Sequence, residues 1–156
     1  MTGRAPVTAF VALGGNLGDA RAAVRQAIQG LALLPGTTLE AASGLYRSAP
    51  HEAQGPDFIN AVARIATALT APDLLRALQA LEAAAGRERP YLNAPRTLDL
   101  DLLFYGDAQI DSPRLTLPHP RWRSRAFVLH PLAEVAPARV TPAMRAAVAG
   151  QAIERL

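Results

Sequence analysis

The sequence predicts an α+β fold in which helices cover one face of a mainly antiparallel sheet. Strand-like and helix-like segments follow one another in the order strand, helix, strand, strand, helix, strand. The length of 156 residues is enough for one domain with a buried core and too short for two. We therefore expect residues 1–156 to form a single domain.

The first strand and the first helix are predicted at the start of the chain. Residues 8–13 are an apolar run typical of a buried strand, and residues 14–18 are rich in turn-forming glycine. Asp19 suits the N-cap of a helix whose apolar side chains recur at helical spacing as far as Leu34. Pro35 and Gly36 then end this helix.

Two strands and a second helix are predicted to follow. Residues 37–46 resemble a strand interrupted at Gly44, and residues 48–56 form a loop rich in proline and glycine. Residues 58–69 predict the third strand. A capping box with proline in the first turn begins the second helix at residues 70–73, and this helix continues to Ala85.

The last third of the chain predicts a final strand and C-terminal additions. The strand lies within residues 95–105, and a short returning strand after Gly106 can pair with it. A helical turn is expected over residues 121–129, and a terminal helix from Thr141 through Leu156. The complete order predicts a ferredoxin-like βαββαβ core.

Composition restricts the possible chemistry. The chain has no cysteine, which excludes disulfides, thiolate catalysis and zinc-thiolate sites. All sixteen basic side chains are arginine, so lysine chemistry is excluded and anion binding is favoured. A net charge of +3 is too small to indicate nucleic acid. No apolar stretch reaches 18 residues, and residues 1–6 do not resemble a signal peptide, so we expect a soluble protein.

Two carboxylates two residues apart are the most informative local feature. Asp99 and Asp101 lie in an apolar strand pattern, so their side chains share one face. Their attachment points are about 6.6 Å apart, and their repulsion is roughly 2 to 2.5 kcal/mol at an effective dielectric near 20. An arginine, screening water or a hard divalent cation could offset this repulsion. An ordinary solvated strand face is the alternative interpretation.

Arginines surround the aspartate pair in the sequence. They lie on both sides of it, at positions 87, 89, 96, 114, 121, 123 and 125. Acidic ligands flanked by guanidinium groups suit a metal-bound polyphosphate, although Arg96 could instead form a surface ion pair with an aspartate. Asn60 is a polar residue in an apolar strand, and His119 stands between two prolines. Each could serve a ligand or have only a structural role.

Together these motifs resemble a known family. The segment from Pro95 to Asp101 is similar to the signature of the 6-hydroxymethyl-7,8-dihydropterin pyrophosphokinases of folate biosynthesis. Further similar motifs occur in the family's order over residues 8–137, namely Leu13 to Gly18, Leu45 to Ser48, Pro56 to Ala61, Glu82 with Gly86-Arg87, Leu117 to Pro120, Arg125 and Phe127. The chain departs from the family pattern at Gly15, Ala49, Asn93-Ala94 and Pro120.

The resemblance implies an ATP-dependent enzyme that transfers pyrophosphate to the hydroxymethyl group of the pterin and releases AMP. Asp99 and Asp101 would bind two magnesium ions, and Arg87 and Arg96 would neutralise the transferred group as catalytic residues. ATP would be bound by Gln79, Glu82, Leu102, Arg114, Thr116, His119 and Arg125. The pterin would be bound by Asn16, Ser48, Ala49, His51, Phe58, Asn60 and Phe127.

We expect this enzyme to be a cytoplasmic monomer with no nucleic-acid or membrane partner. The alternative is a non-catalytic ferredoxin-like module that binds a nucleotide or RNA. Against the RNA-binding alternative, the predicted strands lack a pair of closely spaced aromatic residues for stacking bases, and two acidic residues face the presumed site.

Overall fold

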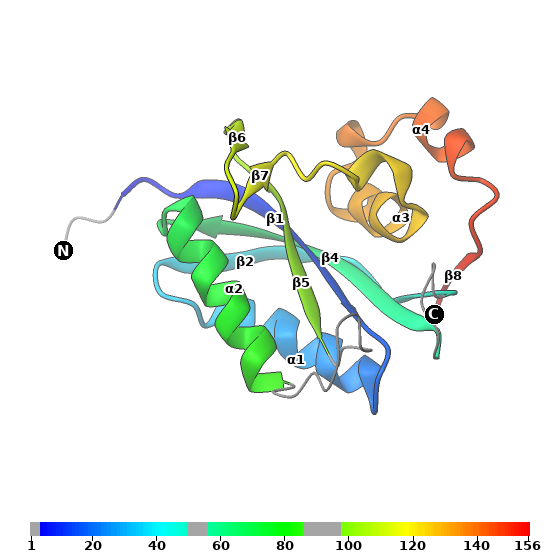
Figure 1. Ribbon diagram of the computed structural model, residues 1–156, viewed down its shortest axis with the longest axis horizontal. Helices are drawn as coiled ribbons and strands as arrows, with labels where there is room; N and C mark the ends of the chain where they lie inside the picture. The colour runs from blue at the N-terminus through cyan, green and yellow to red at the C-terminus, as the bar shows by residue number, and fades with distance from the viewer. Residues whose placement is uncertain (1–3, 50–55, 86–97) are drawn as a thin grey trace.

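A computed structural model describes residues 4–49, 56–85 and 98–156 of the chain (Figure 1). Its elements, in chain order, are β1 (Val7–Gly15), α1 (Ala20–Ala32), β2 (Thr37–Ala42), β3 (Tyr46–Ser48), β4 (Phe58–Thr67), α2 (Ala71–Ala85), β5 (Asp99–Tyr105), β6 (Ile110–Asp111), β7 (Thr116–Leu117), the 3-10 helix η1 (Trp122–Ser124), α3 (Ala126–Val135), the 3-10 helix η2 (Pro137–Arg139), α4 (Pro142–Ala147) and β8 (Ile153–Arg155). The predicted α+β class and the order of the core elements are confirmed.

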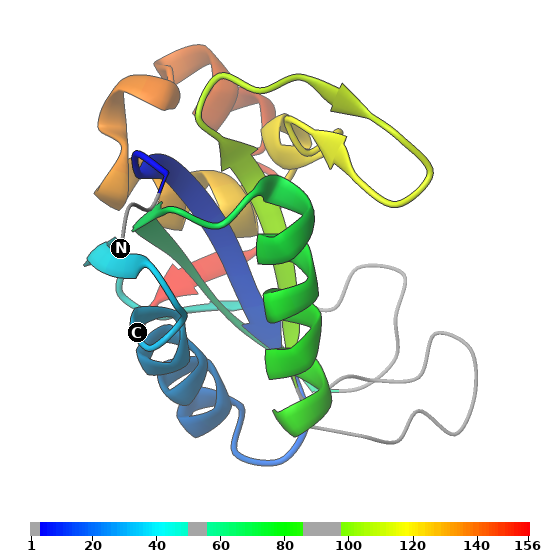
Figure 2. The same ribbon diagram turned by 90° about the vertical axis from the view of Figure 1, so that its left-hand side faces the viewer.

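The main sheet is antiparallel and has the order β5-β1-β4-β3-β8, with β2 also paired to β4. Helices α1 and α2 pack on one face, whereas α3 and α4 lie on the other side of the sheet (Figures 1 and 2). Each face has its own buried core. Val24 of α1 and Leu74 of α2 belong to the first core, and Leu129 and Leu132 of α3 belong to the second.

Alternation along β1 builds both cores at once. Val11 and Leu13 face α1 and α2, while Phe10 faces α3. The predicted helix starts are also confirmed. The Asp19 carboxylate accepts a hydrogen bond from the backbone N–H of Ala22 at the start of α1. The Thr70 hydroxyl accepts one from the N–H of Asp73 at the start of α2.

Three local predictions are wrong in detail. The strand predicted over residues 37–46 is interrupted around Gly44 as expected, which separates β2 from β3, but β3 continues past the predicted end at Tyr46 to Ser48. β1 continues through Gly15, because Gly14 and Gly15 pair with β4 instead of beginning the turn. β6 pairs with β7 and not with β5.

The terminal helix predicted from Thr141 through Leu156 is also wrong. Helix α4 ends at Ala147, and the chain then extends into β8, which pairs with the otherwise open edge of β3. Gly150 weakens a helix at this point, and the ladder to β8 satisfies backbone groups on the edge of β3 that would otherwise be left to water. The region predicted as a turn over residues 121–129 is η1 followed by the longer helix α3.

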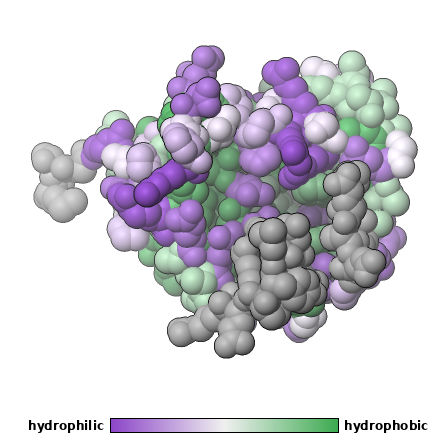
Figure 3. Space-filling model, in the orientation of Figure 1, coloured by the Kyte–Doolittle hydropathy of each residue, from purple (hydrophilic) through white to green (hydrophobic). Residues whose placement is uncertain are grey.

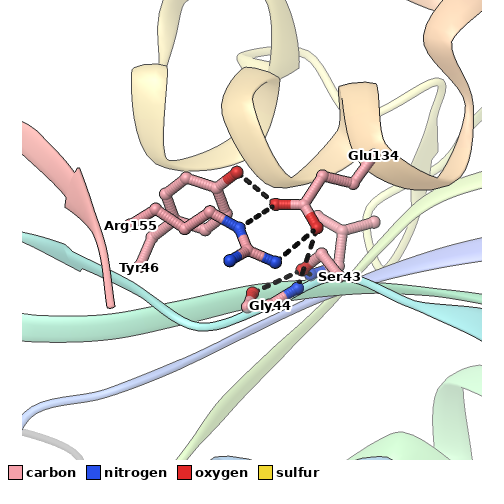
Figure 4. Close-up of polar contacts among 6 residues, drawn as sticks. Ser43, Gly44, Tyr46, Glu134 and Arg155 are labelled. Atoms are coloured by element: carbon pink, nitrogen blue, oxygen red, sulfur yellow. Dashed lines mark hydrogen bonds and ion pairs between the residues drawn. The ribbon is translucent and has the colours of Figure 1, made fainter.

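A polar cluster joins α3 to the strands beneath its C-terminal end (Figure 4). The Glu134 carboxylate accepts hydrogen bonds from the Tyr46 hydroxyl, the Gly44 backbone N–H and the Arg155 guanidinium. Gly44 leaves the space for this arrangement, since a Cβ there would stand 2.5 Å from an Arg155 nitrogen. The cluster connects α3, β3 and β8 through one carboxylate.

We predict that Glu134→Gln lowers the free energy of unfolding at pH 7. Hydrogen bonds from Arg155 are the main reason why the pKa of Glu134 is about 2 in the folded chain, against an ordinary value of 4.5. A lowered pKa means that the ionised group stabilises the fold above pH 4.5, and this stabilisation is lost as the pH falls towards 2. Urea unfolding of both proteins over this pH range measures the effect.

The control is Glu40→Gln, which removes an exposed carboxylate that pairs with Arg64 at 3.3 Å. It should change the unfolding free energy much less. A difference between Glu134→Gln and the wild type that stays constant from pH 7 to pH 2 would contradict the role given to the Glu134 carboxylate.

Candidate active site

The two aspartates project from β5 towards the α3 side of the sheet. In the register of β5 against β1, Asp99 lies opposite Gly14 and Asp101 lies opposite Ala12. Directly opposite residues of an antiparallel pair point to the same face, so these two small residues stand beside the carboxylates. The surface between β5 and β4 is therefore left low, because neither Gly14 nor Ala12 fills it.

Asn60 borders the same low surface from β4. It pairs with Gly14, which places it two strands from Asp99, about 10 Å across the sheet. A Cβ on Gly14 would stand only 3.3 Å from the Asn60 side-chain oxygen. The Asn60 amide donates a 2.8 Å hydrogen bond to the buried Ser48 hydroxyl on β3, which holds the Asn60 side chain against β3.

A cavity of about 690 Å³ lies over this surface, a size typical of small-molecule sites. Between β5 and α3 the molecule is hollowed, with hydrophilic and hydrophobic residues side by side (Figure 3). The start of α3 forms one wall, where the Arg125 guanidinium lies 5.3 Å from the centre of the Phe127 ring. The C-terminal segment 150–152 forms another part of the wall.

Many of the residues predicted from the sequence meet in this cavity. Those that line it are Ser48, Ala49, Phe58, Asn60, Asp99, Asp101, Arg125 and Phe127. They come from β3, β4, β5 and the start of α3, so segments far apart in the sequence converge on one side of the sheet. Amide, hydroxyl and aromatic groups occupy the β3–β4 side, and the carboxylates occupy the β5 side.

The other predicted residues lie elsewhere. Gln79, Arg114 and Thr116 are exposed and do not line the cavity, and the side chain of Leu102 belongs to the core beneath α1 and α2. Asn16 is buried, with its amide donating to the Pro56 carbonyl at 3.3 Å.

Arg87, Arg96 and His51 lie outside the residues that the structure describes. The same is true of the departure from the family pattern at Asn93-Ala94.

Glu82 reaches β5 from α2 at the edge of the sheet formed by the described residues. Its carboxylate accepts a 2.7 Å hydrogen bond from the Leu100 backbone N–H. Burial raises the pKa of Glu82 to about 7, the Leu100 N–H opposes this rise, and a hydrogen bond with Asp99 and the charges of Asp99 and Asp101 add to it. Three carboxyl groups therefore lie near one another at this end of β5.

His119 is held by hydrogen bonds with the backbone of Leu103 and Arg121. Its N–H donates to the Leu103 carbonyl at 2.9 Å, and its Nδ1 accepts from the Arg121 N–H at 3.1 Å. Burial, followed by the charges of Arg125 and Arg121, lowers the pKa of His119. The ring is therefore neutral at pH 7 with its proton on Nε2, which leaves that nitrogen as a hydrogen-bond donor.

Several residues around the cavity were not predicted as site residues. They are Ala12, Leu13, Gly14, Arg121, Ser124, Ala126, Gly150, Gln151 and Ala152. Two small residues at alternate positions of β1 were a usable signal for a low surface. Residues 150–152 could not be predicted as part of the site, because a helix was expected there.

The donor set suits a hard cation. Asp99 and Asp101 offer carboxylate oxygens on one face and line the cavity. No cluster of three or more potential metal ligands occurs within residues 4–49, 56–85 and 98–156. Mg²⁺ is typically held by one or two carboxylates together with waters and substrate phosphates, so a pair of aspartates is sufficient.

A family model described as 7,8-dihydro-6-hydroxymethylpterin-pyrophosphokinase (HPPK) matches residues 10–137. The chain belongs to this family. It is therefore a pyrophosphokinase by family, and the predicted role as an ATP-dependent enzyme of folate biosynthesis is confirmed at that level. The alternative of a non-catalytic RNA-binding module is not favoured.

Relatives named 2-amino-4-hydroxy-6-hydroxymethyldihydropteridine pyrophosphokinase agree with the family match. The protein from Synechocystis is 47% identical over 134 residues, covering 86% of this chain and 69% of the relative. The protein from Pseudomonas aeruginosa is 46% identical over 154 residues, covering 94% of this chain and 95% of the relative.

A solved structure supports the fold. The chain is similar to a protein described as HPPK-DHPS in complex with substrates, with a TM-score of 0.68 and 11% sequence identity. The similarity covers 94% of this chain and 43% of that one. The predicted ferredoxin-like pyrophosphokinase fold is confirmed.

In the described parts of the chain, no helix is both long and apolar enough to cross a membrane.

We predict that, without divalent cations, Glu82→Gln stabilises the fold at pH 8. The pKa of Glu82 is raised from 4.5 to about 7, so ionising this carboxyl costs stability as the pH rises through that range. Glutamine keeps an oxygen for the Leu100 N–H without the charge. We expect a gain of about 1 kcal/mol at pH 8 after solvent screening, and none below pH 4.5.

Thermal and urea unfolding at pH 8 and pH 4 measure this difference. Asp107→Asn, which replaces an exposed carboxylate beyond the end of β5, is the control and should change the free energy of unfolding much less. A Glu82→Gln protein that is less stable than the wild type at pH 8 would contradict the argument.

Proposed function

We propose that the cavity over β1, β4 and β5 binds ATP and 6-hydroxymethyl-7,8-dihydropterin and transfers the pyrophosphoryl group between them. The pterin hydroxyl oxygen forms a bond to the β-phosphorus of ATP, and the bond from that phosphorus to the α,β-bridging oxygen breaks. AMP leaves with the bridging oxygen, and the hydroxyl proton passes to bulk water. The observation that carries this proposal is the shared cavity of Asp99, Asp101 and Asn60.

The acidic side of the cavity suits the triphosphate with magnesium. We assign Asp99 and Asp101 to two Mg²⁺ ions, which when bound neutralise phosphate oxygens and orient the triphosphate. The adjacent positions Ala12 and Gly14 support this assignment, because small side chains leave room for phosphates beside the carboxylates. Transfer through a loose transition state needs mainly alignment and charge neutralisation.

Basic and polar groups account for the remaining ATP contacts. Arg125 borders the cavity and can pair with a phosphate. The neutral His119 can donate from Nε2. We further propose that Gln79, Glu82, Leu102, Arg114 and Thr116 contact the part of ATP that extends beyond the cavity, since none of them lines it. Arg87 and Arg96, which lie outside the described residues, are assigned to the transferred group.

The opposite side of the cavity suits a flat heterocycle with hydrogen-bonding edges. Phe58 and Phe127 provide apolar ring surfaces, and the Asn60 amide, held by Ser48, provides a donor and an acceptor. Ala49 lies on the same border, and Asn16 and His51 are the remaining pterin residues of the proposal. We further propose a single domain, a cytoplasmic monomer, and no nucleic-acid partner.

The test is product identification. The wild-type chain is supplied with ATP, Mg²⁺ and the hydroxymethyl dihydropterin, and the nucleotides are separated by chromatography. AMP formed in equal amount with the pterin pyrophosphate supports the proposal. ADP, or no nucleotide product, would refute it.

We predict that Asp101→Asn removes at least about 99% of turnover while the protein stays folded. Asparagine keeps the size of the side chain and loses the charge that Mg²⁺ requires, and a loss of this kind costs about 3 kcal/mol or more of transition-state stabilisation. Rates of AMP formation and the circular dichroism spectrum are compared with those of Asp111→Asn, an exposed residue of β6. Unchanged turnover in Asp101→Asn would exclude the metal role.

A further inference from the structure

The side-chain amide of Gln151 holds the backbone on both sides of Arg125. Its Oε1 accepts a 2.8 Å hydrogen bond from the Ala126 N–H, and its Nε2 donates a 2.8 Å hydrogen bond to the Ser124 carbonyl. Only this orientation of the amide satisfies both groups, because the reverse would set donor against donor and acceptor against acceptor.

These two bonds define the backbone of Arg125. In an extended residue, the preceding carbonyl and the following N–H point to the same side. Arg125 is extended, with φ −122° and ψ 115°, and Gln151 binds just these two groups, as a neighbouring strand would. Arg125 is also the N-cap of α3 and makes no capping hydrogen bond with its own side chain. Gln151 supplies the missing acceptor from the other end of the sequence.

The constraint acts directly on the wall of the cavity. Ser124, Arg125, Ala126 and Phe127 all line it, and so does Gln151 itself. The Arg125 guanidinium packs over the Phe127 ring at 5.3 Å. Rotation of the Arg125 backbone would therefore move both the cation and the ring with respect to the sheet.

The C-terminal segment does not depend on Gln151 for its attachment. Glu154 forms a 2.8 Å ion pair with Arg47, and the Leu156 N–H donates to the Leu45 carbonyl at 2.9 Å. Arg155 pairs with Glu134. Because β8 is anchored in these ways, we expect the hydrogen bonds of Gln151 to constrain the start of α3 more than they hold the C-terminal segment in place.

We propose that Gln151 is a positioning residue that sets Arg125 and Phe127 for substrate binding. It lies beyond residues 10–137, the part of the chain that the family model matches. The role of Arg125 towards ATP rests on the proposed function. The hydrogen bonds of Gln151 to Ser124 and Ala126 do not.

The test replaces Gln151 with methionine, which keeps the length of the side chain and loses both hydrogen bonds, and with alanine. If Gln151 positions the ATP-binding groups and takes no part in the chemical step, its loss should raise the KM for ATP about three- to tenfold. The kcat should stay within about twofold of wild type. A residue needed only for folding would lower the active fraction, and hence kcat, and leave KM unchanged. Amide hydrogen exchange at Ala126 should become faster in both variants.

Glu154→Gln is the matched control, since it removes an exposed interaction from the same segment. It should leave the KM for ATP and the Ala126 exchange rate unchanged. Folded Gln151→Met and Gln151→Ala proteins with wild-type KM would overturn the inference. So would failure of both variants to fold while Glu154→Gln folds, because Gln151 would then hold the fold.

The proposed function and the role of Gln151 are refuted by different results. A wild-type chain without pyrophosphokinase turnover refutes the proposed function. The inference about Gln151 is then judged by exchange at Ala126, which needs no substrate. Unchanged exchange in the methionine variant overturns it.

Discussion

The antiparallel register of β1 between β5 and β4 is the constraint on which the site depends. It sets Gly14 between Asp99 and Asn60, and Ala12 beside Asp101. Because β1 alternates, the same strand sends Val11 into the core beneath α1 and α2. A shift of β5 by one residue against β1 would turn Asp99 and Asp101 into that core and turn Leu100 and Leu102 out of it, so folding and function require the same register.

The helical layer that contains α3 adds the walls of the cavity above these three strands. Helix α3 packs on the aspartate face through its own apolar core, and the Glu134 cluster ties its C-terminal end to β3 and β8. Gln151 ties its other end to the C-terminal segment. The α3 residues at the cavity are therefore placed by contacts at both ends of the helix, and the segment after α4 belongs to the site as well as to the sheet.

The features that could be predicted from the sequence are those set by interactions between residues close together in the chain. Period-two alternation revealed that Asp99 and Asp101 share a face, and the Asp19 and Thr70 caps revealed where α1 and α2 begin, because those signals are local. Ordered motifs indicated the family. The end of α4 could not be predicted, since it depends on the open edge of β3, and Gln151 could not be found because its partners are 25 and 27 residues away.

Paramagnetic broadening of backbone amide signals by Mn²⁺ can locate the cation beside β5 and β1. The titration uses the labelled wild-type chain with a non-hydrolysable ATP analogue. If β5 and β1 together form the cation platform, Mn²⁺ broadens the signals of Ala12, Gly14, Asp99 and Asp101 first, and Asp101→Asn removes this effect. Broadening that begins elsewhere on the chain, or that persists unchanged in Asp101→Asn, would contradict the account.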